Sequence, residues 1–489
     1  MNSADVIVVG AGPTGLALAC ELALAGVRCR VLERRAEEPN ITRAFAVHAR
    51  TLELLDARGL ADEVLLHGVR VDSVAPVPGS SLDLGVLGSR YPMIFIAPQS
   101  GTERVLRARA ERLGVEIVRG AEVLGIRQDD AGVRVEVGGA QPRTERARYV
   151  VGCDGAHSAV RRLIGVEFAG RQYETHILLA DVRLAEPPAE AMFARTGTDG
   201  AVISVPFGDG WFRVIAWDRQ RDRVPLAEPV TYDEMRDAFR RIAGSDLGMG
   251  QPRWSTRFLS ERRQAARYRV GRVFLAGDAA HVHSPLGGQG MNTGIQDAMN
   301  LGWKLAAAVH GTAAPWLLDS YEGERHPVGE RVLKLTDTFN RLVLGQSKVR
   351  NALQALVIRA ILRFPRSRLA MAERISGIGI GYPARSGADH AWAGRRMPDL
   401  DCAGTRLYEH LRDGRFVLVT RDPFTLDGSP AVRGVRSAAL SGPAMVLVRP
   451  DGYVAWASEE LLTAPRTSAA IAEWCAEPVK QDRPARPRG

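Results

Sequence analysis

The most informative stretch of the sequence is Ala4-Asp-Val-Ile-Val-Val-Gly10-Ala-Gly12-Pro-Thr14-Gly15. The apolar run over residues 4–9 predicts a buried strand, and residues 14–25 predict an apolar helix that ends at Gly26. Val31-Leu-Glu33 predicts a second strand. Strand, glycine-rich turn, helix and strand together predict a βαβ unit with a parallel sheet.

The glycine-rich turn has the spacing of a dinucleotide-binding site. Gly10 permits the tight turn, Gly12 lets the backbone approach a pyrophosphate, and Gly15 allows helix and strand to pack closely. The free N–H groups at the start of the helix favour the phosphate charge. Glu33 ends the second strand, where its carboxylate can accept hydrogen bonds from both ribose hydroxyls and would repel a 2′-phosphate. The unit therefore predicts FAD or NAD, not NADP, at this site.

A second segment, residues 272–305, favours FAD over NAD. Arg272-Val-Phe-Leu-Ala-Gly-Asp278 predicts a strand that ends in an acid, and Asp278 can accept a hydrogen bond from a flavin ribityl hydroxyl. A glycine loop follows, and a helix is predicted from about Asn292. Its N-terminus at Met291-Asn292 can direct unpaired N–H groups and a partial positive charge at the flavin N1–C2=O locus, where negative charge gathers on reduction.

Three motifs in order resemble the class A flavoprotein aromatic hydroxylases, of the para-hydroxybenzoate hydroxylase type. They are Gly10–Gly15, Cys153-Asp154-Gly155-Ala-His-Ser158, and Gly277-Asp278 with its glycine loop. Residues 43–53 and 98–104 resemble further segments of that family. The C-terminal Arg449-Pro-Asp-Gly-Tyr-Val-Ala-Trp456 resembles the redox-inactive thioredoxin-like domain of larger members, which include aromatic polyketide hydroxylases and rifampicin monooxygenases.

The resemblance implies an α/β fold with three parts. These are a Rossmann-like FAD-binding domain of the GR2 type, an inserted antiparallel-sheet substrate domain, and a small C-terminal thioredoxin-like domain that lacks Cys-x-x-Cys. The expected boundaries are 1–171 and 266–385 for the two parts of the FAD-binding domain, 172–265 for the middle sheet domain, and 390–489 for the C-terminal domain. The residues themselves support the inserted sheet, because Ile203–Val214 alternates around a Gly208-Asp-Gly210 turn as an antiparallel hairpin does.

The resemblance also assigns a set of cofactor-binding residues, taken in order along FAD. Those expected at adenine and its ribose are Glu33, Arg34 and the backbone of Val123, and those expected at the pyrophosphate are Thr14 and Arg43. Gln99 and Asp278 are expected at the ribityl chain, and Met291 and Asn292 at the flavin ring. The remaining members of the cofactor-binding set are Gly10, Gly12, Gly15, Asp154, Gly155, Pro285 and Gly290.

Individual members of this set have other interpretations. Arg43 could be a surface cation, and Asp154 could cap a helix predicted at Ser158–Leu163. His157 departs from the family, whose members often carry glycine or arginine there. It is the order and spacing of the whole set that favours FAD.

The function implied by the resemblance is that of an FAD-dependent monooxygenase that consumes NAD(P)H and O2. NADPH or NADH would reduce the flavin, O2 would add at flavin C4a, and the hydroperoxide would hydroxylate an electron-rich ring. The expected substrate is a small aromatic molecule, either a polycyclic polyketide in biosynthetic tailoring or an antibiotic of the rifampicin kind in inactivation. No catalytic side chain is assigned, because the cofactor carries the chemistry. A flavin dehydrogenase or reductase without oxygen insertion, and a flavin-binding sensor without turnover, are the alternatives.

One stripe of side chains bears on the substrate site. Trp211, Arg213, Ile215 and Trp217 lie on one face of a predicted strand. This face either forms the floor of a substrate cavity, with an arginine for a phenolate or carboxylate, or packs in a core, which is the commoner role of such a stripe.

Composition and charge exclude other classes of function. Apart from short runs, the arginines that give a net charge of +9 are spread along the chain, so no nucleic-acid partner is expected. Five scattered cysteines, with no signal peptide and no apolar run of membrane-spanning length, predict a cytoplasmic protein without a membrane partner, as a monomer or homodimer. His281 and His283 have no third ligand nearby, so no metal is expected.

Overall fold

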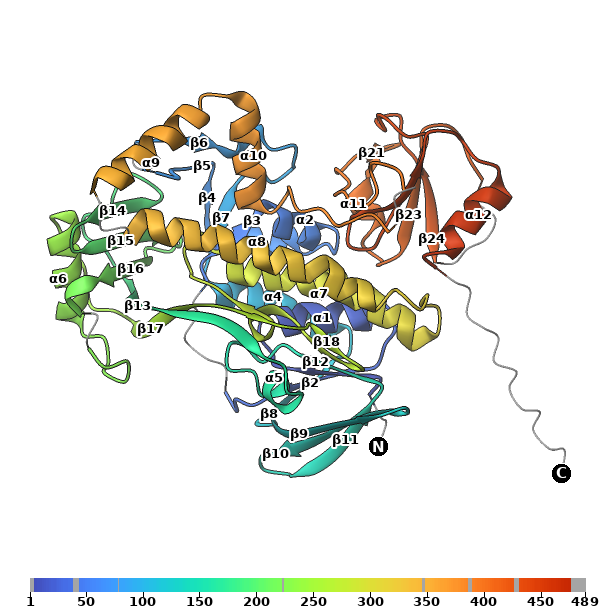
Figure 1. Cartoon of the computed structure of the whole chain (residues 1–489), viewed down its shortest axis with the longest axis horizontal. Coiled ribbons are helices and arrows are strands. Elements are labelled where there is room, and N and C mark those ends of the chain that lie inside the picture. Colours follow the sequence, from blue (N-terminus) through green and yellow to red (C-terminus); the bar gives the residue numbers. More distant parts are fainter. Residues whose placement is uncertain are drawn as a thin grey trace.

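The computed structural model describes residues 4–37, 44–77, 79–221, 224–344, 348–385, 389–425 and 431–475. Figure 1 shows a body crossed by long central helices, with an antiparallel sheet at one side and a C-terminal module at the other. No helix in these described ranges combines the length and apolar character that crossing a bilayer requires.

The central sheet has six strands in the order β18-β19-β12-β1-β2-β8. All neighbours are parallel except the antiparallel pair β18 and β19. The strands are β1 (Val6–Val9), β2 (Cys29–Glu33), β8 (Glu116–Arg119), β12 (Tyr149–Gly152), β18 (Arg269–Val270) and β19 (Val273–Leu275). Both β1 and β12 are buried along their whole length, as expected of parallel strands covered on both faces.

Two helices of this sheet carry the segments singled out by the sequence. Helix α1 (Pro13–Leu24) lies within one residue of its predicted bounds and packs against α7 (Gln289–His310). Helix α7 begins three residues before the predicted Asn292, because Gly288 takes a left-handed conformation (φ +62°) that starts the helix at once. The N-termini of both helices thus follow directly on glycine-containing turns.

The remaining elements of the first half surround this sheet. Between β2 and β8 lie β3 (Ala46–His48), α2 (Ala49–Asp56), α3 (Ala61–Leu65), β4 (Val69–Val71), β5 (Ser73–Val74), β6 (Leu82–Asp83), η1 (Leu84–Val86), β7 (Ile94–Ile96) and α4 (Gln99–Arg112). A three-stranded antiparallel sheet and a short helix flank β12: β9 (Glu122–Asp129), β10 (Gly132–Gly138), β11 (Arg143–Ala147) and α5 (Ala159–Leu163).

A second six-stranded sheet has the order β14-β15-β16-β13-β17-β20 and is antiparallel throughout. Its elements are β13 (Phe168–Val182), β14 (Phe193–Gly197), β15 (Gly200–Pro206), β16 (Phe212–Asp218), η2 (Arg219–Arg221), α6 (Tyr232–Ala243), β17 (Trp254–Ala265) and β20 (His281–Val282). The predicted hairpin is the pair β15–β16. One face packs on α6, while the other, with Ile177 and Leu179, joins the main core. Since β20 follows directly on η3 (Gly277–Ala279), this sheet is tied to the Gly277-Asp278 loop.

Long helices lead to a C-terminal module. The helices are α8 (Asp319–Leu344), α9 (Lys348–Ile361) and α10 (Pro365–Ser376). The module contains β21 (Asp401–Cys402), β22 (Thr405–Arg406), α11 (Leu407–His410), β23 (Phe416–Thr420), β24 (Val432–Arg436), β25 (Met445–Val448), β26 (Val454–Ser458) and α12 (Ala464–Ala472).

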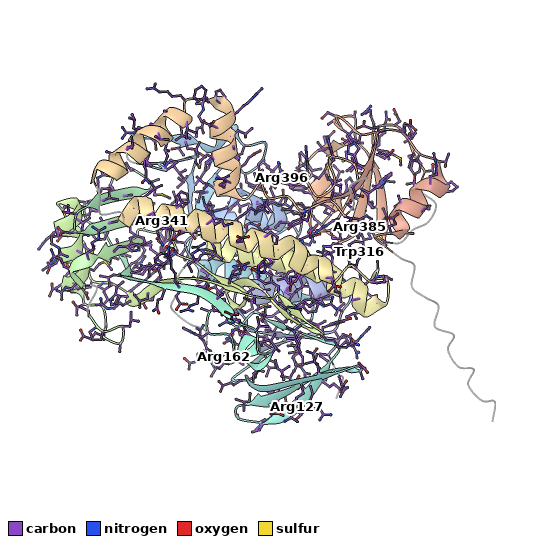
Figure 2. All side chains as sticks on the ribbon, viewed as in Figure 1. Arg127, Arg162, Trp316, Arg341, Arg385 and Arg396 are labelled. Carbon is purple, nitrogen blue, oxygen red and sulfur yellow. The ribbon has the colours of Figure 1, made fainter. Side chains whose placement is uncertain are left out.

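Charged side chains hold this module against the body. Arg449, buried in the module, donates two hydrogen bonds to Glu324 of α8 at 2.8 and 2.9 Å. Arg396 donates to Glu53 of α2 at 3.0 Å, and the Arg385 guanidinium lies 4.5 Å from the ring centroid of Trp316. Figure 2 labels Arg396, Arg385 and Trp316 along this contact. The module is therefore joined to the body by buried ion pairs as well as by apolar packing.

Candidate functional site

Two adjoining cavities lie where the predicted cofactor-binding segments meet. The larger, of about 410 Å³, extends from the start of α1 and the loop before α7 to strands β13 and β17. The smaller, of about 190 Å³, lies beside the end of β2. Both are lined by Gly12, Cys153, Gly155 and His157, so the two cavities adjoin and share part of a wall.

Each glycine of the first turn is explained by a different feature of the local geometry. Gly10 has φ +103°, and a Cβ there would lie 2.5 Å from the carbonyl oxygen of Cys153. A Cβ on Gly15 would clash with the carbonyl oxygen of Gly10, so this glycine is required by packing. A Cβ on Gly12 would meet nothing within 4 Å, although this residue lines both cavities. The backbone at Gly12 is thus open to a ligand that approaches closely.

The smaller cavity gathers the residues predicted for the adenosine half. Glu33, Arg34, Val123 and Asp154 all line it. The Glu33 carboxylate accepts hydrogen bonds from the backbone N–H of Ala11 at 2.8 Å and of Arg35 at 2.9 Å. Its position at the end of β2 is therefore fixed by the glycine turn itself.

Asp154 makes contacts that match its interpretation as a cap. It accepts hydrogen bonds from the Ser158 hydroxyl at 2.6 Å and from the Val160 N–H at 3.1 Å, at the start of α5. Ser158 is the N-cap residue itself, accepting from the Arg161 N–H. Asp154 thus stabilises the start of α5 and lines the smaller cavity at the same time.

The larger cavity gathers the residues predicted for the ribityl chain and ring. Its lining includes Thr14, Gln99, Asp278, Pro285, Gly290 and Met291. Gln99 begins α4; its amide oxygen accepts from the Ala44 N–H at 3.0 Å, and its amide nitrogen donates to Glu103 at 2.7 Å. Arg43 lies outside the described residues.

Asn292 lies behind the cavity wall. It is buried, accepts from the His48 N–H at 2.8 Å, and donates to the carbonyl oxygens of Ala46 and Gly288 at 2.9 and 2.7 Å. It therefore holds β3 against the start of α7. A Cβ on Gly288 would lie 2.8 Å from that of Ala46, so the loop and β3 are in close contact.

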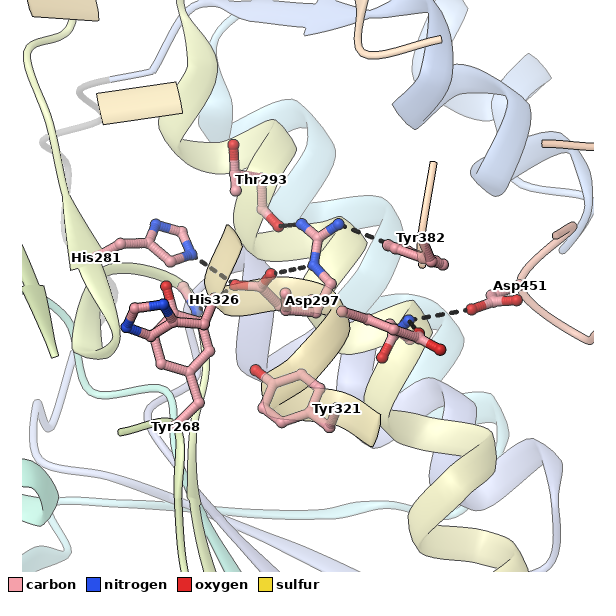
Figure 3. A network of polar contacts seen from close by, with 12 residues as sticks. Tyr268, His281, Thr293, Asp297, Tyr321, His326, Tyr382 and Asp451 are labelled. Carbon is pink, nitrogen blue, oxygen red and sulfur yellow. Dashed lines mark hydrogen bonds and ion pairs between the residues drawn. The ribbon is translucent and has the colours of Figure 1, made fainter. Parts of the chain in front are cut away.

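A buried network behind the loop was not found by sequence reasoning. Asp297 of α7 accepts hydrogen bonds from the Gly277 N–H at 3.0 Å, from His281 Nε2 at 2.7 Å and from Arg325 Nε at 2.6 Å. Arg325 also donates to the Tyr382 hydroxyl at 3.2 Å, and Figure 3 shows Asp297 and Tyr382 on either side of this contact. Burial raises the pKa of Asp297, but the charges of Arg325 and His281 outweigh it and hold the pKa below its ordinary value. Because Gly277 precedes Asp278, this network fixes the cavity loop to α7 and α8.

The two loop histidines have separate roles. His281 belongs to the buried network, while His283 lines the larger cavity. His283 Nδ1 donates to the Ser284 carbonyl oxygen at 2.9 Å, which leaves Nε2 as a hydrogen-bond acceptor. Burial lowers the pKa of His283, so its ring is uncharged at neutral pH. Within the described ranges no cluster of three or more His, Cys, Asp or Glu side chains could hold a metal ion.

The antiparallel-sheet wall comes from residues that the sequence did not identify. Gln172 of β13 and Phe258, Leu259, Ser260 and Glu261 of β17 line the larger cavity. They belong to β13 and β17, whereas the sequence indicated individual strands of this sheet only around the hairpin at Ile203–Val214.

Three residues of the stripe lie on β16 and pack in the interior, while Trp211 precedes the strand and is partly buried. Arg213 is fully buried and donates two hydrogen bonds to Asp181, at 2.9 and 3.1 Å. Ile215 and Trp217 belong to the main apolar core. The cavity lining in the described chain includes none of the stripe residues, so the core-packing interpretation fits and the cavity-floor interpretation does not.

The sequence family agrees with this geometry. Residues 3–336 match the FAD binding domain family, and residues 390–478 match the C-terminal domain of aromatic-ring hydroxylases. The chain therefore belongs to the FAD-binding aromatic-ring hydroxylases, a class of flavin-dependent monooxygenases.

Particular relatives match nearly the whole chain. It is 42% identical over 482 residues to a rifampicin monooxygenase of Streptomyces venezuelae, covering 94% of this chain and 97% of that protein. It is 38% identical over 507 residues to the 12-dehydrotetracycline 5-monooxygenase/anhydrotetracycline 6-monooxygenase of Streptomyces rimosus, covering 97% and 99%. The solved structure of OxyS, an anhydrotetracycline hydroxylase from Streptomyces rimosus, has a TM-score of 0.85 at 36% identity and covers 98% of this chain and 100% of that one.

Proposed function

We propose that the protein uses NAD(P)H and O2 to hydroxylate a polycyclic aromatic substrate of the polyketide or ansamycin antibiotic kind. The observation that carries the proposal is that the two cavities adjoin and share lining residues. One is lined by the residues predicted for adenosine, and the other by those predicted for the ribityl chain and flavin, with an antiparallel sheet opposite. A cofactor that extends across both cavities would thus bring its flavin ring next to a flat substrate in the larger one.

The residues present fit FAD. Gly12 leaves open space beside the start of α1, where unpaired N–H groups favour a pyrophosphate. Glu33 and Arg34 would hold the adenosine ribose, and Gln99 and Asp278 the ribityl chain. Gly290 and Met291, in the first turn of α7, would direct N–H groups and the positive end of the helix dipole at the flavin ring.

FAD would supply the redox chemistry, accepting two electrons from the coenzyme and activating O2. One oxygen atom enters the ring as a hydroxyl, the other leaves as water, and NAD(P)H and a proton are consumed. The chain's own residues bind, orient and exclude water. The β17 wall, with Phe258 and Leu259, supplies apolar contacts, and Gln172 and Glu261 supply polar ones for substrate oxygens.

The relatives support two substrate classes, tetracycline-type polyketides and rifampicin. We also propose that the C-terminal module is thioredoxin-like. Its strand order is β24-β23-β25-β26, with β23 and β24 parallel and the other two pairs antiparallel. The domain boundaries at 171, 265 and 385–390 and the GR2 type of the first domain belong to the same proposal.

The test is coenzyme oxidation coupled to oxygen insertion. The purified protein, saturated with FAD, is mixed with NADPH or NADH in air and with anhydrotetracycline-type polyketides or rifampicin. The expected result is coenzyme oxidation accelerated by one compound, with a product one oxygen atom heavier that carries label from ¹⁸O2. Accelerated coenzyme oxidation by an artificial electron acceptor, without any labelled product, would instead support a flavin dehydrogenase.

A further inference from the structure

One long segment of the chain contains basic side chains and no acidic ones. Residues 338–372 contain seven Lys or Arg and no Asp or Glu, so they account for seven of the formal net charge of +9. The segment owes its net charge to the lack of acidic residues, because its arginines are spread along it as they are elsewhere in the chain. It includes the end of α8, all of α9 and the first two turns of α10.

The same segment exposes an apolar face. On α9 and the turn that follows, Leu353 is 60% exposed, Leu356 62%, Val357 49%, Ile361 44% and Phe364 65%. Their spacing of three and four residues places them on one side of the helix. The segment from 353 to 369 holds half of the large apolar side chains that are exposed in the described part of the chain. Isolated exposed apolar side chains need no explanation, but a contiguous group does.

The opposite face of α9 is held by the body. Ile358 packs against the main core, and Leu362, at the end of the helix, is buried in it. The side that points outward is therefore fixed, and it is bordered by exposed Arg359 and Arg363, with exposed Arg366 just beyond the turn. In Figure 1, α9 and α10 meet in an elbow at the outer edge of the molecule, away from the C-terminal module. The helix that carries the apolar face thus lies at the periphery of the molecule.

We propose that this elbow docks on an anionic lipid surface. Leucine, isoleucine and phenylalanine on one side with arginine at the borders is the pattern of a helix that lies in the plane of a membrane interface. The charge complements anionic headgroups, each arginine near the surface adding to the attraction. The proposal replaces the expectation of no membrane partner and adds no membrane-spanning element.

Two other occupants fit the charges less well. A second copy bringing the same face would oppose two segments that each carry seven positive charges. Residues 476–489 of this chain contain four basic and two acidic side chains, so they do not neutralise the segment. An acidic protein would match the charge, but a single helix face at the periphery offers it little enclosure.

The test is flotation of the FAD-loaded, full-length protein with vesicles. Two compositions are compared: phosphatidylcholine alone, and equal parts of phosphatidylcholine and phosphatidylglycerol. The expected result is binding to the anionic vesicles that weakens as ionic strength rises. Leu356→Ser/Phe364→Ser should weaken this binding roughly tenfold or more, and Arg363→Gln/Arg366→Gln roughly tenfold at low salt.

Matched controls come from surfaces elsewhere on the chain. Leu66→Ser removes a leucine that is 71% exposed, and Arg127→Gln/Arg134→Gln removes two charges from the β9–β10 sheet. Both controls should bind vesicles like the wild type, and all variants should keep the wild-type flavin spectrum.

Three outcomes would overturn the proposal. The first is no binding to anionic vesicles, and the second is binding that the apolar variant leaves unchanged. The third is that the elbow mediates a different association while vesicle binding is absent. This association would be a concentration-dependent dimer, or a complex with an acidic protein or nucleic acid, and the elbow variants would abolish it. Each of these readouts is independent of substrate turnover, so failure here and failure of the hydroxylase proposal are distinguishable.

Discussion

The two walls of the large cavity are built in different ways. On one wall Gly12, Gly288 and Gly290 present backbone, and their positions follow from turn geometry and helix starts. On the other wall β17 presents side chains such as Phe258 and Leu259. A wall made of backbone presents the same N–H and C=O groups whatever the surrounding side chains are. A wall made of side chains can instead differ between proteins that bind different substrates. The difference explains how one scaffold can serve relatives with different substrates.

The largest effect is expected where the backbone wall depends on packing. Gly15→Val places a branched side chain against the carbonyl oxygen of Gly10, so α1 and β1 cannot keep their contact. We expect little folded protein and no bound FAD, measured by soluble yield and visible absorption. Gly101→Ala is the control, because a Cβ there meets nothing within 4 Å in helix α4. A soluble, yellow Gly15→Val protein would contradict this account of the turn.

The antiparallel sheet depends instead on a buried charge. Asp181, 1% exposed, accepts hydrogen bonds from Arg213, Arg253 and Trp254 at 2.8 to 3.1 Å. Asp181→Asn leaves Arg213 buried without a counter-charge, and should lower the free energy of unfolding by about 3 kcal/mol. Urea unfolding followed by circular dichroism measures it. Asp209→Asn, at an exposed turn of the same sheet, should stay within about 0.5 kcal/mol of the wild type. Equal losses in the two variants would argue against a buried charge network.

The contrast also accounts for what the sequence could predict. The βαβ unit and the loop before α7 are local, and their glycines and acids have fixed spacing, so Gly12, Glu33 and Asp278 could be assigned to a site from the sequence alone. The Asp297 network joins α7, α8 and the Gly277 loop, which lie apart in sequence, and Asp297 carries no motif of its own. The cavity-facing residues of β17 could not be named either, because alternation gives the two faces of a strand but not the position of a cavity at its edge.

On the backbone wall, Gly12→Ala should weaken FAD binding without lowering the stability of the protein. Such a result would distinguish a residue that contacts the ligand from one that is needed for packing. Gly12→Ala adds a methyl group that meets nothing within 4 Å in the protein, so the thermal midpoint of the apoprotein should hardly change. The methyl group would, however, occupy the space where a pyrophosphate approaches, and the Kd for FAD should rise roughly 10- to 100-fold. Fluorescence titration with FAD measures the Kd. An unchanged Kd would place the pyrophosphate elsewhere.

A pH effect should come from His48, on β3 beside the loop. Burial lowers its pKa to about 4, whereas an unfolded chain has about 6.5. Because the folded pKa is lowered, the unfolded state binds more protons below pH 6.5, and stability is lost as pH falls from there towards 4. We expect the free energy of unfolding to fall by about 2 kcal/mol from pH 7 to pH 5 through this group. His48→Gln should remove that difference, while exposed His67→Gln should keep it. If the free energy of unfolding of His48→Gln falls with pH as steeply as that of the wild type, other groups cause the effect.

The smallest effect is expected from a substitution that changes only the side-chain wall. Leu259 lines the larger cavity from β17, and Leu259→Ala removes part of its apolar contact with a flat substrate. Since one such contact is worth about 1–3 kcal/mol of discrimination, KM for the aromatic substrate should rise roughly tenfold. The Kd for FAD should stay unchanged, because the cofactor contacts lie on the opposite wall. Leu124→Ala, at a 57% exposed leucine on β9, is the control for both measurements. If Leu259→Ala raises the Kd for FAD as much as the KM for the substrate, one wall does not bind the cofactor and the other the substrate. The substrate must then lie elsewhere in the cavity.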